Sequence, residues 1–153
     1  MIEPIVKCAA GLDVHQGSVT CTVLEEQSTG APRRETRQYA TFPRRLKELG
    51  RWLKERGVEL AVLESTGIYW KSVYAALEEA GIQTYLVNAR HVKQVPGRKT
   101  DVADSEWLAE LARCGLLKAS FVPPRDLREL RLLTRYRRKM SGCLAGEKNR
   151  LQK

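Results

Sequence analysis

Four acidic residues of this chain could carry chemistry together: Asp13, Glu64, Asp101 and Asp104. The last two are three residues apart where an amphipathic helix is predicted to begin, and positions i and i+3 of a helix share one face. Carboxylates held side by side repel each other, and a hard divalent cation relieves that repulsion. With no local excess of histidine or cysteine, the set favours Mg²⁺ or Mn²⁺ over zinc. Two such ions, about 3.5–4 Å apart, can activate a nucleophile and stabilise a leaving oxygen in phosphodiester chemistry.

Each acid also has a plainer interpretation. Thr100 or Asp101 suits the N-cap of the predicted helix, and the positive end of the helix dipole favours Asp104. Asp13 suits the turn that follows it, and Glu64 suits the cap of the next helix. A metal site therefore requires that the fold bring all four carboxylates to one place.

The hydrophobic pattern predicts elements that can position them. Three strands joined by short turns imply an antiparallel meander, after which helices and strands alternate. The expected strands are Cys8–Val14, Val19–Leu24, Thr36–Phe42, Leu60–Leu63 and Ile82–Val87. The expected helices are Pro43–Arg56, Tyr69–Ala80, a short one over Asn88–Val95, one that opens with Asp101 and stops near Gly115, and a long one from Asp126 onward.

This order predicts an α/β fold with a mixed five-stranded sheet flanked by helices, followed by a long basic helix. Asp13 lies near the end of the first strand, and Glu64 directly follows the apolar run of the fourth. If the first helix is a right-handed crossover, these two strands are parallel neighbours. Functional groups of open α/β sheets gather at the carboxyl ends of such strands.

The positive charge is concentrated at the C-terminal end. The chain of 153 residues has a formal charge of +9, of which +7 falls between Arg125 and Lys153. A basic helix suits a polyanion, most plausibly nucleic acid, although a solvated helix face is the alternative. Two groups of basic residues are the expected phosphate contacts. They are Arg90, Lys93, Arg98 and Lys99 before the second acidic pair, and Arg128, Arg131, Arg135, Arg137, Arg138 and Lys139 in the long helix.

The long helix also carries an apolar stripe that includes Leu127, Leu130, Leu133 and Tyr136. Spacings of three and four favour a contact between helices, so we expect a homo-oligomer, a dimer or tetramer, formed through this segment. No stop signal precedes Lys153, and we therefore expect the chain to be a fragment of a longer protein.

The composition excludes several other classes. The four cysteines show no metal-binding spacing, which is typical of reduced thiols in a cytosolic protein. No signal peptide begins the chain, and no apolar run approaches the roughly 20 residues of a membrane helix. Neither Ser65 nor Ser105 has the His–Asp arrangement of a serine nucleophile. We expect a cytoplasmic protein with no membrane partner.

Three blocks of the sequence resemble the signatures of the DEDD-type insertion-sequence transposases, a family that includes Piv-type invertases and bridge-RNA-guided recombinases. The blocks are Gly11-Leu12-Asp13-Val14-His15, Leu63-Glu64-Ser65-Thr66-Gly67-Ile68-Tyr69-Trp70 and Lys99-Thr100-Asp101-Val102-Ala103-Asp104. The resemblance spans about Gly11 to Leu117. Each block alone is weak, but the ordered set is specific.

The resemblance implies a RuvC-like domain of the ribonuclease H superfamily over residues 1–122. The four acids of the family fall on Asp13, Glu64, Asp101 and Asp104, which are expected to bind Mg²⁺ or Mn²⁺. Residues 123–153 would begin a coiled-coil linker to a transposase domain that carries a nucleophilic serine and is absent from this chain.

The function so implied is catalysis at DNA phosphodiester bonds by a transposase or recombinase, with DNA as partner and a guide RNA as a candidate second partner. A Holliday-junction-type or single-strand nuclease that acts by plain hydrolysis is the alternative enzyme. A nucleic-acid-binding, oligomerising module without a metal is the alternative of a different class, and it rests on the basic helix.

Overall fold

The computed structural model describes residues 4–65, 67–96 and 103–152. Five strands form one sheet in the order β3-β2-β1-β4-β5. The pairs β1–β2 and β2–β3 are antiparallel, whereas β1–β4 and β4–β5 are parallel. The predicted mixed sheet is confirmed, as is the parallel pairing of the first and fourth strands. The strands are β1 (Cys8–Val14), β2 (Ser18–Glu25), β3 (Arg33–Ala40), β4 (Leu60–Glu64) and β5 (Thr84–Val87).

The strand boundaries differ from the predicted ones most in β3. This strand begins at Arg33 instead of Thr36 and ends at Ala40 instead of Phe42. It is a polar strand that pairs with β2 over its whole length, from Arg33 opposite Glu25 to Ala40 opposite Ser18. A polar edge strand carries little hydrophobic periodicity, so the ladder, and not the pattern, fixes its limits.

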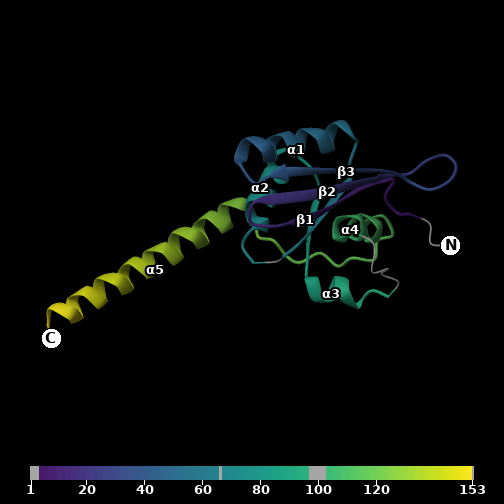
Figure 1. Cartoon of the computed structure of the whole chain (residues 1–153). Coiled ribbons are helices and arrows are strands. Elements are labelled where there is room, and N and C mark those ends of the chain that lie inside the picture. The colour runs from purple at the N-terminus through teal and green to yellow at the C-terminus, as the bar shows by residue number, and fades with distance from the viewer. Residues whose placement is uncertain (1–3, 66, 97–102, 153) are drawn as a thin grey trace. The chain divides into compact units, whose positions relative to one another are not determined.

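Helices α1 (Pro43–Glu55) and α2 (Trp70–Glu79) cover one face of the sheet, and α4 (Asp104–Arg113) covers the other (Figure 1). The crossing of α1 and α2 is close, because a Cβ on Gly50 would lie 3.0 Å from the Cβ of Ala80. Beneath α1, Leu49 and Leu53 are fully buried. Burying a leucine side chain contributes about 1.5–3 kcal/mol, so these contacts hold α1 on its face.

On the opposite face, α4 and the short helix α3 (Ala89–Gln94) share one apolar cluster with the sheet. Trp107 and Leu108 of α4 pack there with Val92 of α3 and with Ala9 and Val62 of the central strands. The α4 helix ends at Arg113, Cys114 is its C-cap, and Gly115 after it adopts a positive φ of 66°. Glycine tolerates this left-handed conformation and so supplies the predicted stop.

Residues 1–120 form one compact unit, and residues 121–153 form a second. The second unit consists mainly of α5 (Arg125–Leu151), in which no residue is buried. The exposed side chains include the predicted apolar stripe, with Leu130 at 55% and Leu133 at 67% exposure. Within the described ranges, no helix combines the length and the apolar character that a membrane span requires.

Candidate active site

Asp13 and Glu64 lie at equivalent positions of adjacent parallel strands. The strand register pairs Gly11 with Val62 and Leu12 with Leu63, so Asp13 and Glu64 are the next positions of the two strands. Parallel strands end at the same edge of the sheet, and both acids occupy that carboxyl edge. Both are partly exposed, whereas the residue before each is fully buried. The edge therefore opens to solvent where the carboxylates begin.

Both acids belong to the face of the sheet that α4 covers. Side chains alternate along a strand, so Asp13 shares a face with Gly11, and Glu64 shares a face with Val62. Gly11 lies against the backbone of α4, and Val62 packs in the apolar cluster with Trp107 and Leu108. The two carboxylates are thus on one face as well as at one edge.

The α4 helix runs antiparallel to β1, which brings its N-terminal end to the same edge. At the other end of the helix, the carbonyl of Arg113 accepts a 2.8 Å hydrogen bond from the backbone N–H of Ile5, just before β1 begins. Asp104 is the first residue of α4 and is exposed. The direction of the helix therefore places Asp104 toward the end of β1 that carries Asp13.

Gly11 sets how closely α4 approaches the sheet. A Cβ built on Gly11 would lie 2.0 Å from the carbonyl oxygen of Ser105 and 2.5 Å from the backbone nitrogen of Ala109. Only a residue without a side chain fits at this contact. A glycine inside an apolar strand is the sequence signal for such close backbone approach.

A buried pair of hydroxyls fixes the first turn of α4. The Oγ atom of Ser105 lies 2.8 Å from Oγ1 of Thr22 on β2, and Thr22 Oγ1 lies 2.9 Å from Oγ1 of Thr36 on β3. Ser105 is 1% exposed and Thr22 is fully buried. This contact joins residues 83 apart in sequence, and it anchors the residue next to Asp104. Ser105 therefore serves the packing of the helix.

His15 is the polar neighbour of the first acid. Its Nε2 atom lies 3.1 Å from Oδ2 of Asp13, and the imidazole is mostly exposed. A contact from the turn after β1 restricts the rotamer of Asp13, since that oxygen has a fixed partner. His15 is thus placed to orient the carboxylate.

The second acidic pair is described only in part. Asp101 lies outside the described residues. The predicted start of the helix at Asp101 is wrong, because α4 begins at Asp104 and Ala103 before it has extended angles, φ −59° and ψ 143°. Among the residues that the structure describes, no group of three or more histidine, cysteine or acidic side chains converges to hold a metal ion.

The predicted basic residues fall into two places. Arg90 and Lys93 are exposed on α3, and Arg98 and Lys99 lie outside the described ranges. The α3 helix starts two residues after Val87, which pairs with Glu64, and the side chain of Asn88 caps it by accepting from the backbone N–H of Arg90 at 2.9 Å. Arg90 and Lys93 therefore follow the same carboxyl edge of the sheet.

The other basic residues lie on α5. Arg131, Arg135, Arg137, Arg138 and Lys139 are exposed, and Arg128 is partly buried. The five exposed residues turn their charge to solvent along a helix of 27 residues.

The buried thiols take no part in this site. Burial raises the pKa of the Cys21 thiol strongly, and burial together with the charge of Glu25 raises the pKa of Cys8. Both thiols stay protonated at neutral pH, and a protonated thiol is a poor metal ligand and nucleophile.

Comparison with known proteins agrees with this architecture. A family model described as a transposase, the DEDD type of IS110 elements, matches residues 10–153. The Thermus thermophilus RuvC structure is similar with a TM-score of 0.53 and 17% identity, covering 74% of this chain and 99% of that one. The structure of T. thermophilus RuvC in complex with a Holliday junction substrate gives a TM-score of 0.49 at the same identity and coverage. A comparison with curated proteins found no match. The likeness to RuvC confirms the ribonuclease H-like fold.

Proposed function

The chain belongs to the DEDD-type transposase family of IS110 elements, and from this membership we propose that residues 1–122 are the metal-dependent catalytic domain of a DNA transposase or recombinase. This domain acts on DNA phosphodiester bonds to mobilise an insertion sequence, and residues 123–153 begin a helical linker. The observation that carries the proposal is the placement of Asp13 and Glu64 at equivalent positions of adjacent parallel strands, on the face that is covered by the helix beginning with Asp104.

The chemistry of the donors supports a hard cation. The described acids offer carboxylate oxygens, which Mg²⁺ and Mn²⁺ prefer. Asp13 and Glu64 share one edge and one face of the sheet, and Asp104 begins the helix that covers that face. Asp13, Glu64, Asp101 and Asp104 are the residues that would hold the ions. Bound there, the metal supplies activation of a nucleophile and stabilisation of the leaving oxygen.

The side chains around the acids have separate tasks. His15 fixes one oxygen of Asp13 through its 3.1 Å contact, which leaves the other oxygen for a ligand. The partial positive charge at the start of α4 favours anionic groups at this edge. Arg90 and Lys93 follow the same edge on α3, and they are the residues that would contact the phosphates of the DNA strand.

The test is nicking of a branched DNA by the whole chain in Mn²⁺. The changes Asp13→Asn and Asp104→Asn keep the size of each side chain and remove its charge, so we expect nicking to fall at least about 100-fold. Glu110→Gln is the matched control, because Glu110 is an exposed acid on the same helix, remote from its N-terminal end. Nicking that persists in both acid variants would reject the proposed site.

The products of the same assay distinguish a recombinase from a nuclease. Joined DNA strands would support a recombinase, whereas only hydrolysed ends would assign a Holliday-junction-type or single-strand nuclease. Calorimetric titration with Mn²⁺ adds a direct measurement. Binding lost in Asp13→Asn and in Asp101→Asn places these two acids in one site, including the one that the structure does not describe.

A binding and oligomerising module is the second candidate, and the exposed stripe of α5 favours it. Leu130, Leu133 and Tyr136 are each more than half exposed on one helix. We propose that α5 pairs with a second copy of the chain to give a dimer or tetramer. Sedimentation should show that Leu133→Glu lowers the oligomer mass and that Thr134→Glu, beside the stripe, does not.

A guide RNA is part of the proposal because some members of the family use one. Recombination by the whole protein should then require an added RNA and should stop after ribonuclease treatment. Recombination of DNA without any RNA would remove the guide RNA from the proposal. The proposed role of the four acidic residues would still stand.

A further inference from the structure

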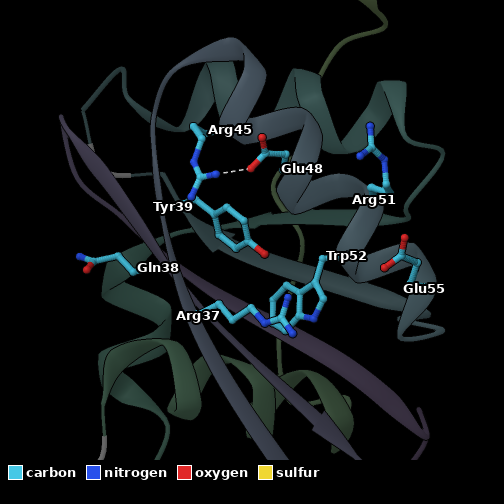
Figure 2. A pocket seen from close by; sticks show the side chains of 8 residues that line it. All are labelled: Arg37, Gln38, Tyr39, Arg45, Glu48, Arg51, Trp52 and Glu55. Atoms are coloured by element: carbon cyan, nitrogen blue, oxygen red, sulfur yellow. Dashed lines mark hydrogen bonds and ion pairs between the residues drawn. The ribbon is translucent and has the colours of Figure 1, made fainter.

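The face of the sheet opposite to the carboxylates carries a hollow between β3 and α1. Its volume is about 550 Å³, and Arg37, Tyr39, Arg45, Arg51 and Trp52 are among the side chains that line it (Figure 2). This volume falls in the range of about 300–1,000 Å³ that small-molecule sites occupy. The lining is mostly charged and aromatic.

Two arginines lie over two aromatic rings in this hollow. The guanidinium carbon of Arg37 is 4.6 Å from the centre of the Trp52 ring, and that of Arg45 is 5.8 Å from the centre of the Tyr39 ring. The rings are buried, at 5% and 7% exposure. The Arg37 side chain is half exposed, at 49%. Its guanidinium group therefore has Trp52 on one side and solvent on the other.

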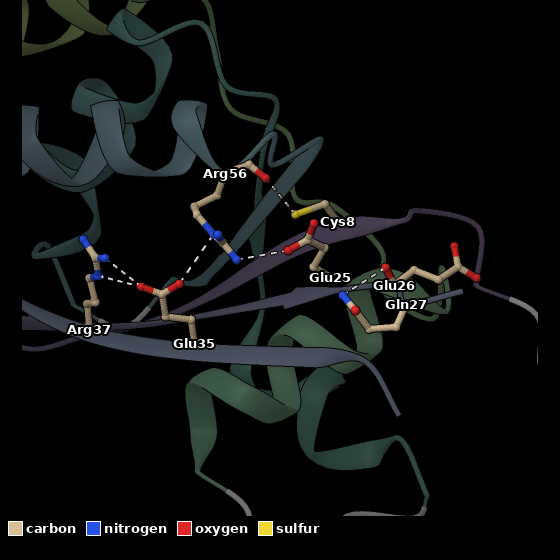
Figure 3. Close-up of polar contacts among 7 residues, drawn as sticks. All are labelled: Cys8, Glu25, Glu26, Gln27, Glu35, Arg37 and Arg56. Atoms are coloured by element: carbon tan, nitrogen blue, oxygen red, sulfur yellow. Dashed lines mark hydrogen bonds and ion pairs between the residues drawn. The ribbon is translucent and has the colours of Figure 1, made fainter. Parts of the chain in front are cut away.

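A series of ion pairs holds Arg37 in this position and ends at Glu25, the last residue of β2 (Figure 3). Its Nε and Nη2 atoms lie 2.9 Å and 2.7 Å from Oε1 of Glu35. The other oxygen of Glu35 is 3.5 Å from Nε of Arg56, which donates from Nη2 to Glu25 at 3.0 Å. Because Arg37 is already ordered, a ligand that stacks on it loses little side-chain entropy.

The charge around the hollow is positive. Between Pro43 and Arg56 the chain has six Lys or Arg residues and two Glu residues. Arg45 pairs with Glu48, whereas Arg51 has no carboxylate partner within the described part of the chain. In the same described part, the buried Nε1 of Trp52 lacks a hydrogen-bond acceptor. The hollow therefore offers an unpaired cation, Arg51, beside the buried ring of Trp52.

We propose that this hollow binds one unpaired nucleotide of a single-stranded nucleic acid, with the base stacked on the outer face of Arg37 and the phosphate on Arg51. Guanidinium planes stack on unpaired bases, and such sites tolerate many sequences. The site is separate from the carboxylate edge, because Arg37 and Tyr39 point to the α1 face of the sheet while Asp13 and Glu64 point to the α4 face. It needs no metal.

The test follows the Trp52 indole N–H in the whole chain by NMR. The chain has three tryptophans, so labelling with ¹⁵N-tryptophan gives three indole signals, and Trp52→Phe and Trp107→Phe each assign one of them. Four-nucleotide strands of thymidine and of uridine are titrated in EDTA. We expect a saturable shift of the Trp52 signal with both strands, while the signal of Trp107, on the other face, stays in place.

Two variants sharpen the test. Arg51→Gln should raise the dissociation constant, measured from the Trp52 signal, about tenfold. A loss of this size corresponds to one charge-assisted hydrogen bond. Arg33→Gln removes the same charge from β3 outside the hollow and should leave binding unchanged. Asp13→Asn should also leave it unchanged, which separates this site from the proposed catalytic one. Tighter binding of uridine strands would assign the site to RNA. Equal binding would assign it to single strands of both RNA and DNA.

Two results would overturn the proposal. One is a Trp52 signal that does not move when the strands are saturating. The other is an equal shift with a short oligoglutamate, because that would mean that the arginines bind acidic protein segments by charge alone.

Discussion

The two faces of the same sheet are built by different means. On the α4 face, backbone meets backbone at Gly11, and a buried hydroxyl pair joins Thr22 to Ser105. On the α1 face, the hollow is held by ion pairs of partly exposed side chains, with Arg37 and Arg56 on either side of Glu35. The comparison teaches that the face with the carboxylates is held by close, buried contacts, whereas the arginines of the other face are positioned by ion pairs that solvent reaches.

The largest effect should come from breaking the close contact on the α4 face. Gly11→Ala would drive a Cβ into the Ser105 carbonyl at 2.0 Å, so α4 must move away from the sheet. We expect a loss of at least about 3 kcal/mol in the free energy of unfolding, measured by urea denaturation. Gly17→Ala is the control, since its added Cβ would meet nothing within 4 Å. Equal stability of the two variants would show that the α4 backbone does not pack against Gly11.

A smaller loss should follow from removal of one buried hydroxyl. Thr22→Val keeps the shape of the side chain but leaves the Ser105 hydroxyl without its partner on β2, which costs about 1–3 kcal/mol. Urea denaturation of Thr22→Val, Ser105→Ala and the double variant should show coupling between the two sites. Additive losses would mean that the 2.8 Å contact does not anchor α4. Thr20→Val, two residues earlier on the same strand, serves as the control.

The smallest effect on stability should come from the α1 face. Glu35→Gln removes the charge between Arg37 and Arg56, but all three side chains are partly exposed, and exposed ion pairs contribute about 0–1 kcal/mol. We expect the unfolding free energy to change by no more than that, while the Trp52 indole signal shifts because Arg37 is less restrained. Glu26→Gln should change neither. A loss of unfolding free energy as large as that of Gly11→Ala would show that the two faces contribute equally to stability.

The sequence predicted the sheet well because its central strands are apolar and short, and turn residues separate them. Asp13 and Glu64 could be assigned to one edge from a right-handed crossover alone, and the strand register agrees. The polar β3 begins three residues earlier and ends two residues earlier than predicted, because its limits come from pairing with β2. The helix start at Asp101 was wrong because a favourable acidic first turn does not show which of two acids is the first helical residue.

Other features could not be predicted because they depend on contacts between distant segments. Thr22 and Ser105 are ordinary polar residues in the sequence, and only the docking of α4 makes them partners. The arrangement of Arg37 over Trp52 similarly requires β3 and α1 to lie side by side. By contrast, the glycine at position 11 was an available signal, since glycine in a buried strand indicates that another backbone comes close.

The antiparallel docking of α4 has a consequence for the order of events during synthesis. The sheet can begin to assemble from the first 87 residues, but Asp104 and the contacts of Ser105 and Trp107 reach β1 and β2 only after the later residues have been made. Closing so long a loop is slow relative to pairing neighbouring strands. A nascent chain therefore has most of its sheet before α4 brings Asp104 to the edge that carries Asp13 and Glu64.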